Sequence, residues 1–535
     1  MKRLYVLGCL LLSAFMLAGC GKGKVVEDNL TPYEVSDDNY RNYYEIFVRS
    51  FYDSDGDGYG DLNGVTKKLD YIRDLGYTGI WLMPINPSPS YHKYDVTDYY
   101  SVDKMYGSVD DLKNLINECH KRDIKLILDL VLNHSSDKAP MFHKSIEAHD
   151  KAINGRSLSE EDKKFKDFYT FFDSENDIPG GVKAYKVPGK NFYFEGNFWS
   201  GMPEFNCDSL WVQKEFENII KYYMEMGIDG FRLDAVKYYF MGSTAKNIEF
   251  LSKIKGWATK YNPDAYIIGE CWDSSSVITN YYESGVDSFF NFTTAVTNSN
   301  SGVLNGINRD GKNLNSYYNA MKSNDQIIGT SKGIPAPFLN NHDTFRFTST
   351  SKPDRSKFQY ACLQMLGGTT FTYYGDEVGM IGSNSGDLPD ENVRIPLKWG
   401  ESGNKGDCKN LSGATVHKYV YPNISEQMKD NNSILNYYKQ VLRVRNQNPE
   451  IARGKVSLVE KNVQDSKLLF VSKEYNNSKI GIIFNFDPVN ELNVDYKKHG
   501  FNEVVGQIRV DTEKYIEIQR DGAITMPAYS IVVVK

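Results

Sequence analysis

Short apolar runs alternate with helix-length amphipathic segments from about residue 43 onward. Most of these runs are rich in β-branched and aromatic residues and apolar on both faces, which is typical of buried parallel strands. Eight runs have this character: residues 44–51, 79–84, 125–132, 230–235, 266–270, 288–292, 336–340 and 369–374. Amphipathic stretches, such as residues 109–122 and 213–226, lie between them. Eight β/α units in succession predict an α/β fold, a closed (β/α)8 TIM barrel.

Two segments depart from this alternation. Residues 135–205 separate the third strand from its helix and contain polar, glycine-rich stretches, so we expect a small inserted domain there. After a helix near residues 433–446, short alternating runs fill residues 451–535 and predict an antiparallel β-sandwich. The barrel is therefore expected in two parts, residues 37–134 and 206–450.

The amino terminus has the pattern of a secretory signal. Lys2 and Arg3 precede an apolar run that ends in Leu-Ala-Gly-Cys at Cys20. This ending resembles the lipobox of bacterial lipoproteins, and that resemblance implies removal of residues 1–19 and lipidation of Cys20. A retained membrane helix is the alternative, but the run is short for one. Residues 20–36 are expected to be a flexible tether, and the protein is expected on the extracellular face of the cell envelope.

Composition narrows the class of partner. The 535 residues carry a net charge of −7 and no basic run beyond the first residues, which argues against nucleic acid. A neutral, polar substrate and a monomeric protein are expected. Five cysteines remain after the signal and Cys20, and their wide spacing indicates neither a disulfide framework nor a zinc site.

Polar side chains end several predicted strands. Asp234 ends the fourth strand, Glu270 ends the fifth, and Asp343 follows the seventh. Barrel enzymes place reacting groups at these strand ends, so the three carboxylates are expected at one mouth. Arg232 lies two residues before Asp234, on the same strand face, and stabilises a carboxylate nucleophile. Glu270, facing other carboxylates, suits a general acid, and Asp343 would stabilise a cationic transition state.

These segments, in their order along the chain, resemble conserved regions I to IV of the α-amylase family, glycoside hydrolase family 13. The resemblance extends to Gly-Ile-Trp-Leu-Met-Pro at residues 79–84 and Gly-Asp-Glu-Val-Gly at residues 375–379, and it covers nearly the whole mature chain. It implies that Asp234 is the nucleophile, Glu270 the acid/base and Asp343 the transition-state stabiliser.

The same resemblance implies a substrate-binding set. His134, Arg232 and His342 match residues that hold the sugar at the cleavage subsite, and Tyr94 matches the aromatic that stacks under it. Asp95 and Arg346 are candidates for a supporting salt bridge.

Two segments depart from the family pattern, at Glu204 and Phe205 and at Tyr238. Residues 202–206 (Met-Pro-Glu-Phe-Asn) resemble the MPDLN form of region V, typical of an intermediate subgroup that includes lipid-anchored α-amylases. Lys237, a further substrate-binding candidate, is followed by Tyr238, where the family often has His. Because of that change, the sequence does not decide whether the usual interdomain calcium site, which includes Asn133, is present.

Acidic residues alternate with glycines directly after the first predicted strand. Asp53, Asp55, Asp57 and Asp61, with the carbonyl of Tyr59, provide hard oxygen ligands at the spacing that suits Ca²⁺. The loop resembles the calcium loop of oligo-1,6-glucosidases. We expect a structural Ca²⁺ here, with a solvated acidic turn as the alternative.

The sequence thus predicts retaining, endo-acting hydrolysis of α-1,4-glucosidic bonds in starch, amylose and maltooligosaccharides. A neopullulanase-like enzyme, an exo-acting α-glucosidase and a transglycosylase of the same family remain alternatives. A non-catalytic glucan-binding lipoprotein is the alternative of a different class, and the presence of all three carboxylates argues against it.

Overall fold

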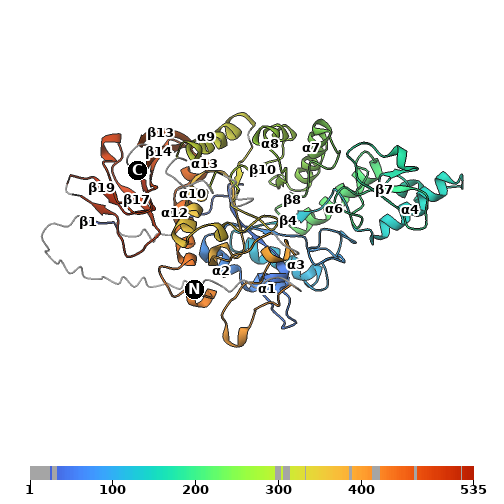
Figure 1. The fold of residues 1–535 in the computed structure, drawn as a ribbon, viewed down its shortest axis with the longest axis horizontal. Helices are drawn as coiled ribbons and strands as arrows, with labels where there is room; N and C mark the ends of the chain where they lie inside the picture. Colours follow the sequence, from blue (N-terminus) through green and yellow to red (C-terminus); the bar gives the residue numbers. More distant parts are fainter. Residues whose placement is uncertain are drawn as a thin grey trace, which may run out of the picture.

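The computed structural model describes residues 24–26, 33–295, 303–304, 314–331, 333–384, 388–411, 422–462, 467–519 and 521–535. Its elements are arranged along one long axis (Figure 1). The C-terminal β sheets lie at one end, the barrel in the middle, and the segment between β4 and α6 at the other end. Among the described residues, no helix combines the length and apolar character needed to cross a bilayer.

Eight parallel strands form the barrel, as predicted. They are β2 (Asn42–Ile46), β3 (Gly79–Leu82), β4 (Lys125–Leu130), β8 (Gly230–Leu233), β9 (Tyr266–Gly269), β10 (Ser288–Asn291), β11 (Ala336–Pro337) and β12 (Thr370–Tyr373). The sheet runs in the order β11-β10-β9-β8-β4-β3-β2-β12. A parallel bridge between Phe338 and Phe371 joins the two edge strands and closes the barrel.

Helices between these strands form the outer layer. They are α1 (Leu62–Lys67), α2 (Leu69–Leu75), α3 (Val109–His120), α6 (Leu210–Met226), α7 (Thr244–Tyr261), α8 (Ser275–Tyr281), α9 (Leu314–Ser331), α10 (Pro353–Met365) and α12 (Ile434–Gln447). The helix α6, for example, buries Val212, Phe216 and Ile220 on one stripe, the spacing that an amphipathic helix needs to cover a sheet.

All eight strands are shorter than predicted, and the first and the seventh differ most. The first ends at Ile46, and a 3-10 turn over Val48–Ser50 follows it instead of further strand. The seventh is only Ala336–Pro337, since Pro337 has no N–H to donate to a neighbouring strand. Both changes shorten the strands on the side of the mouth, where loops carry the polar residues.

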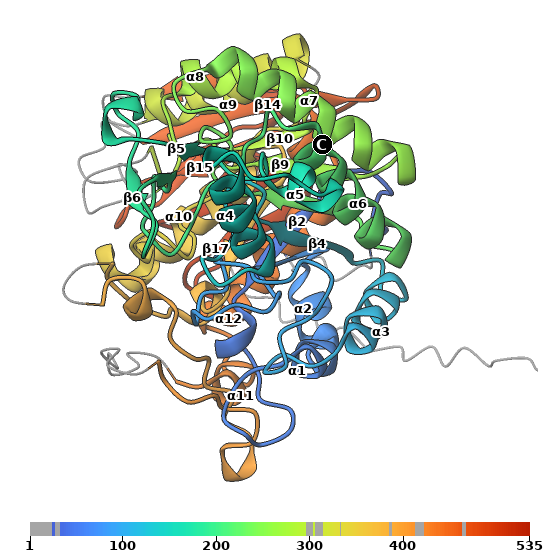
Figure 2. The ribbon, with the colours of Figure 1, turned by 90° about the vertical axis from the view of Figure 1, so that its right-hand side faces the viewer.

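The long connection after β4 is a separate layer at the barrel mouth. It contains α4 (Pro140–Ile153), α5 (Glu160–Phe165) and a three-stranded sheet of β5 (Phe171–Phe172), β7 (Tyr193–Glu195) and β6 (Ala184–Lys186). Figure 2 looks onto this end of the molecule, with α4 in front of the barrel strands. A bridge between His134 and Glu204 ties the segment to the end of β4.

The C-terminal region is an antiparallel two-sheet sandwich. One sheet has β13 (Lys455–Asn462), β14 (Leu468–Tyr475), β15 (Ser478–Asn485), β20 (Ser530–Val534) and β17 (Val504–Arg509). The other has β16 (Leu492–Val494), β19 (Ile524–Met526), β18 (Glu517–Ile518) and β1 (Lys24–Val25). The strand β1 falls inside the segment expected to be a flexible tether, so at residues 24–26 the chain is paired rather than free.

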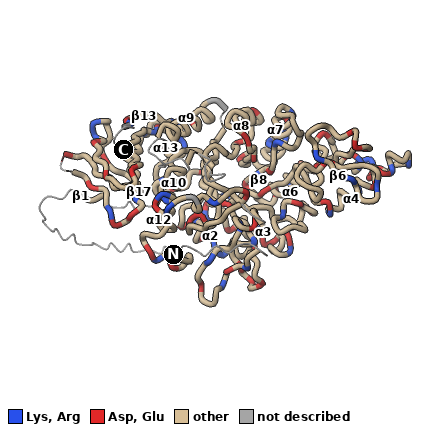
Figure 3. Tube along the Cα trace, viewed as in Figure 1, with Lys and Arg blue, Asp and Glu red and all other residues tan. Residues whose placement is uncertain are grey.

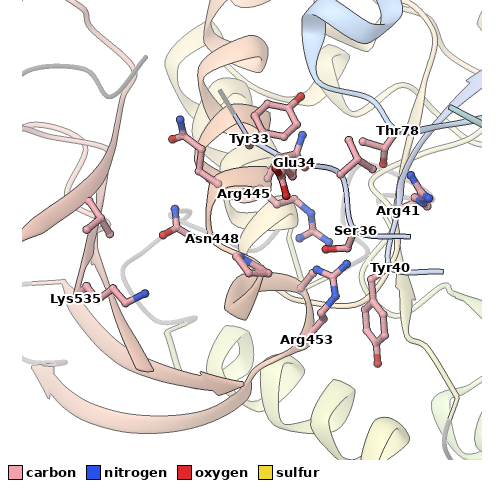
Figure 4. Close-up of a pocket in the computed structure, with 16 residues that line it drawn as sticks. Tyr33, Glu34, Ser36, Tyr40, Arg41, Thr78, Arg445, Asn448, Arg453 and Lys535 are labelled. Atoms are coloured by element: carbon pink, nitrogen blue, oxygen red, sulfur yellow. The ribbon is translucent and has the colours of Figure 1, made fainter. Parts of the chain in front are cut away.

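The sandwich packs against the end of the barrel away from the mouth. A cavity of about 340 Å³ lies at this junction, with Tyr33, Arg445 and Arg453 in its wall (Figure 4). Arg445 donates to the Gly368 carbonyl, and Arg453 donates to Asp38 at 2.7 and 2.8 Å. Through these hydrogen bonds, the two arginines join the chain around residues 445–453 to Gly368 and to Asp38.

Candidate active site

Three carboxylates surround one buried guanidinium at the mouth of the barrel. Nη1 of Arg232 lies 2.9 Å from Asp129 Oδ1 and 2.7 Å from Asp234 Oδ1, and Nη2 lies 2.9 Å from Glu270 Oε2. The strands β4, β8 and β9 are neighbours in the sheet, which explains why residues far apart in the chain meet here. Because Asp234 and Glu270 contact two nitrogens of the same guanidinium, the two carboxyl groups lie close together at the mouth.

Burial and charge together set the protonation of Glu270. Its burial, together with the nearby Asp234 and Asp343, raises its pKa to about 7 against the opposing attraction of Arg232. The Ala235 N–H, 3.1 Å from Glu270 Oε2, fixes the carboxyl in place. A carboxyl group that holds its proton near neutral pH can act as a general acid.

Asp343 is held in the opposite state. Burial favours its neutral form, but His342 and Arg394 lower its pKa well below the usual range. His342 Nε2 lies 2.9 Å from Asp343 Oδ2, and Arg394 Nη2 lies 2.9 Å from Oδ1. The site therefore places one protonated and one ionised carboxyl group at the same mouth.

His342 connects the two sides of the site. Its Nδ1 lies 2.6 Å from Glu45 Oε1, and Tyr94 OH lies 2.6 Å from its Nε2. Although burial disfavours the charged imidazole, Asp343 and Glu45 raise its pKa to about 10. The Tyr94 ring stacks on the His342 ring with centroids 5.5 Å apart, and Tyr94 OH is 3.0 Å from Asp129 Oδ2.

Backbone strain accompanies these side chains. Ala235 and Lys93 have φ of 46° and 68°, in the left-handed region that non-glycine residues rarely adopt. Ala235 directly follows Asp234, and Lys93 directly precedes Tyr94. Such conformations persist where the surrounding structure over-determines them, which is common at catalytic centres.

The other predicted site residues have different surroundings. His134 is buried, and its Nε2 has no hydrogen-bond partner among the described residues, which leaves this nitrogen for a ligand. Lys237 Nζ lies 2.6 Å from Asp273 Oδ2, on the loop that follows β9.

The expected salt bridge between Asp95 and Arg346 is wrong. Arg346 is fully buried and pairs with Asp376 at 2.9 Å, and it donates to the carbonyl oxygens of Tyr374 and Val393. Asp95 instead accepts a hydrogen bond from Ser88 Oγ at 2.6 Å. The connection between β11 and α10 that carries Arg346 thus buries its guanidinium, and Arg394 is the arginine that reaches Asp343.

Sequence reasoning missed three residues of this network: Glu45, Asp129 and Arg394. Glu45 and Asp129 lie on the buried strands β2 and β4. Each could have been found in the sequence as a carboxylate inside an apolar strand, because such a group requires a partner. Arg394 lies in a loop after β12, and no local pattern distinguishes it.

The acidic loop after β2 brings three of its four aspartates together. Asp53, Asp55 and Asp61 each offer an oxygen, and these oxygens lie within 4.8 Å of one another. Asp57 is not in this group, and its Oδ1 accepts from the Tyr59 N–H at 2.7 Å. Hard carboxylate oxygens converging in a glycine-containing loop fit Ca²⁺.

Comparison with known proteins identifies the family. The family model "Alpha amylase, catalytic domain" matches residues 45–454. This chain belongs to the α-amylase family. It is therefore a glycoside hydrolase, and it has the barrel fold of this family.

The relatives that are similar over most of their length are named for different activities. α-Amylase 3 of Dictyoglomus thermophilum is 34% identical over 93% of both chains. The solved structure of Eubacterium rectale Amy13B is 37% identical with a TM-score of 0.84, over 94% of this chain and 97% of that one. An oligo-1,6-glucosidase of Parageobacillus thermoglucosidasius is 27% identical, over 83% of this chain and 89% of its own.

Proposed function

We propose that this α-amylase family member hydrolyses internal α-1,4-glucosidic bonds of starch-type glucans with retention of configuration. The observation that carries the proposal is Arg232, whose guanidinium contacts both Asp234 and Glu270. Lys and Arg are interspersed with Asp and Glu over the described part of the chain (Figure 3), which suits a neutral sugar polymer better than a polyanion.

Each carboxyl group has one role in this reaction. Glu270 donates its proton to the glycosidic oxygen as the C1–O bond breaks, and Asp234 attacks C1 to form a covalent glycosyl-enzyme. Glu270, now ionised, then takes a proton from the water that attacks C1, and the bond to Asp234 breaks. Asp343, kept ionised by His342 and Arg394, stabilises the positive charge of both transition states.

Product analysis tests the substrate assignment. On amylose, the mature chain is expected to give a mixed series of maltooligosaccharides from the first minutes, with the α-anomer formed first. Panose from pullulan would add neopullulanase character. Glucose as the sole early product would refute endo action, and a first-formed β-anomer would refute retention.

The pH dependence of the reaction follows from Glu270. Since the active form is protonated and its pKa is about 7, kcat/KM is expected to fall tenfold per pH unit above about 7. Initial rates on a soluble maltooligosaccharide between pH 4 and 9 measure this limb, within the range in which the protein keeps its fold. A flat profile to pH 9 would exclude Glu270 as the acid.

Trp272 is a candidate platform for sugars on the leaving-group side. It is 47% exposed, follows the acid Glu270 by two residues, and stacks on Phe292 with ring centroids 4.7 Å apart. An exposed ring held flat in this way offers its other face to a sugar. Trp272→Ala is expected to raise KM for maltoheptaose about tenfold with little change for an activated maltosyl fluoride. The exposed Trp211→Ala, on α6, serves as the matched control.

We also propose that the acidic loop after β2 holds a structural Ca²⁺, bound by the converging Asp53, Asp55 and Asp61, with Asp57 and the carbonyl of Tyr59 as the further ligands that the sequence predicts. The loop that they form is connected to a distant segment, because the Asp53 N–H donates to Gly406 O and Lys409 Nζ donates to Asp57 O. Asp61 also caps α1 by accepting from the Gly64 N–H. A bound cation would add its attraction to these ties without contacting the reacting carboxylates.

Chelation tests the calcium site. Excess EDTA is expected to lower the melting temperature by several degrees, and added Ca²⁺ to restore it, since a ligand that binds only the folded state stabilises it. Asp55→Asn should reduce this response, whereas Asp74→Asn, at an exposed aspartate in the last turn of α2, should not. An identical melting curve with EDTA would contradict the site.

Finally, we propose that the protein is a lipoprotein, attached through Cys20 to the outer face of the bacterial membrane, and monomeric. The support is the signal-like segment that ends in Cys20. Mass spectrometry of the protein extracted from membranes tests this, and an unmodified residue 20 would contradict it.

A further inference from the structure

The N-terminal strand β1 belongs to the C-terminal sandwich. Lys24 and Val25 pair with Ile518 and Glu517 of β18, and the Val26 N–H donates to Ile516 O at 3.0 Å. Gln507 of β17, in the other sheet, donates its side-chain amide to Val26 O at 2.9 Å. The segment is thus hydrogen-bonded to both sheets of the sandwich.

Side-chain burial distinguishes the two valines. Val26 packs against the apolar cluster inside the sandwich, which includes Ile516 and Ile524. Val25 is 40% exposed, as expected for the next residue of a strand, which faces the other way. Val25 and Val26 therefore face opposite sides, with Val26 partly buried against the sandwich and Val25 toward solvent.

The direction of β1 places its N-terminal end. Because β1 is antiparallel to β18 and Lys24 lies opposite Ile518, the first residue of β1 lies next to the β18–β19 turn, which Gly522 closes by donating to Gln519 O. Cys20 is four residues before Lys24, a distance of at most roughly 14 Å along an extended chain.

This end of β1 lies far from the barrel mouth. The strand β1 is at one end of the long axis, and α4 and β7, which cover the mouth, are at the other (Figure 1). Tyr33 and Glu34, the next described residues, line the cavity that Arg41, Thr78 and Lys535 also line (Figure 4).

We propose that residues 24–26 dock the lipidated N-terminus onto the sandwich, so that the sandwich faces the membrane and the barrel mouth faces away from it. The orientation rests on the proposed lipidation of Cys20, whereas the docking does not. A docked anchor presents the catalytic mouth to long glucans outside the cell, which a freely rotating tether would not do.

Cross-linking tests the docking without the lipid. Val25 and Glu517 are register partners, so in residues 20–535 carrying Cys20→Ser, the pair Val25→Cys and Glu517→Cys is expected to form a disulfide under mild oxidation. The five remaining native cysteines are all buried, and each single variant is a control for their reactivity. Absence of the cross-linked peptide pair would overturn the docking.

Energy transfer tests the orientation in the lipidated protein. A dye is attached at Asp521→Cys, in the β18–β19 turn, or at the exposed Asn176→Cys, near the mouth, and the protein is inserted into phosphatidylethanolamine–phosphatidylglycerol vesicles with a rhodamine-labelled lipid. We expect strong quenching at residue 521 and little at residue 176. Equal quenching at both positions would overturn the orientation.

A matched pair of variants ties the orientation to β1. Val26→Asp places a carboxylate against the apolar cluster and should abolish the difference between the two dyes, while Val25→Asp adds the same charge on the exposed side and should retain it. Hydrolysis of a small soluble substrate should be unchanged in both. If the protein does not bind vesicles, the proposed lipidation is wrong, and the membrane orientation that rests on it is overturned. The disulfide cross-link between residues 25 and 517 would still test the docking.

Discussion

Glu270→Gln is expected to lower kcat/KM on amylose by about 10²–10⁴-fold, because the amide cannot donate the proton that the leaving oxygen needs. Asp234→Asn is expected to abolish turnover, because no covalent intermediate can form. The melting temperature of each variant should stay within a few degrees of the parent, since both substitutions keep the shape of the side chain. Initial rates, with enzyme purified from a host without amylase, measure the effect.

A substrate with a good leaving group separates the two roles. α-Maltosyl fluoride needs no proton to lose fluoride, so Glu270→Gln should recover much of its first-step rate with this substrate, whereas Asp234→Asn should not. Asp208→Asn, an exposed carboxylate paired with Lys246, is the control for a general effect of losing a charge. Rates like those of the parent in either variant would refute the assignment.

Arg232→Met is expected to have the second largest effect, on both stability and turnover. The guanidinium is fully buried among Asp129, Asp234 and Glu270, and removing one member of a buried ionic group costs about 3–5 kcal/mol. Loss of its attraction also raises the pKa of Glu270 and Asp129 further above their ordinary values. The variant should therefore melt well below the parent at pH 8.

The destabilisation should depend on pH in a definite direction. Protonation removes the uncompensated charge on these carboxyl groups, so the stability gap between Arg232→Met and the parent should narrow as the pH falls from 8 to 5. Arg232→Lys, which keeps the charge but cannot contact several carboxylates in a fixed geometry, should lie between the two. Melting curves at both pH values measure this, and a gap that is equal at pH 5 and pH 8 would contradict it.

The sequence alone was sufficient to predict the eight strands and their order along the chain. Apolar runs of strand length recur at the spacing of β/α units, and burying both faces of such a run requires helices on one side and a packed barrel interior on the other. It was also enough to place Asp234, Glu270 and Asp343 at one mouth, since parallel strands in a barrel end at the same side. Their roles came from the family resemblance and from local charge, through Arg232 on the same strand face as Asp234.

The tertiary structure decided which partners those residues meet. Arg346 and Arg394 both follow barrel strands and are indistinguishable by local pattern, yet only Arg394 reaches Asp343, and Arg346 is buried against Asp376. The carboxylate of Glu45 is drawn into the site by His342, from a strand almost three hundred residues away. The pairing of β1 with β18 could not be predicted either, because a two-residue strand is stabilised by a distant sheet edge and not by its own sequence. Local patterns thus determined the elements and their chemistry, and long-range packing determined the contacts between them, because those contacts depend on which strand ends and edges the closed fold brings together.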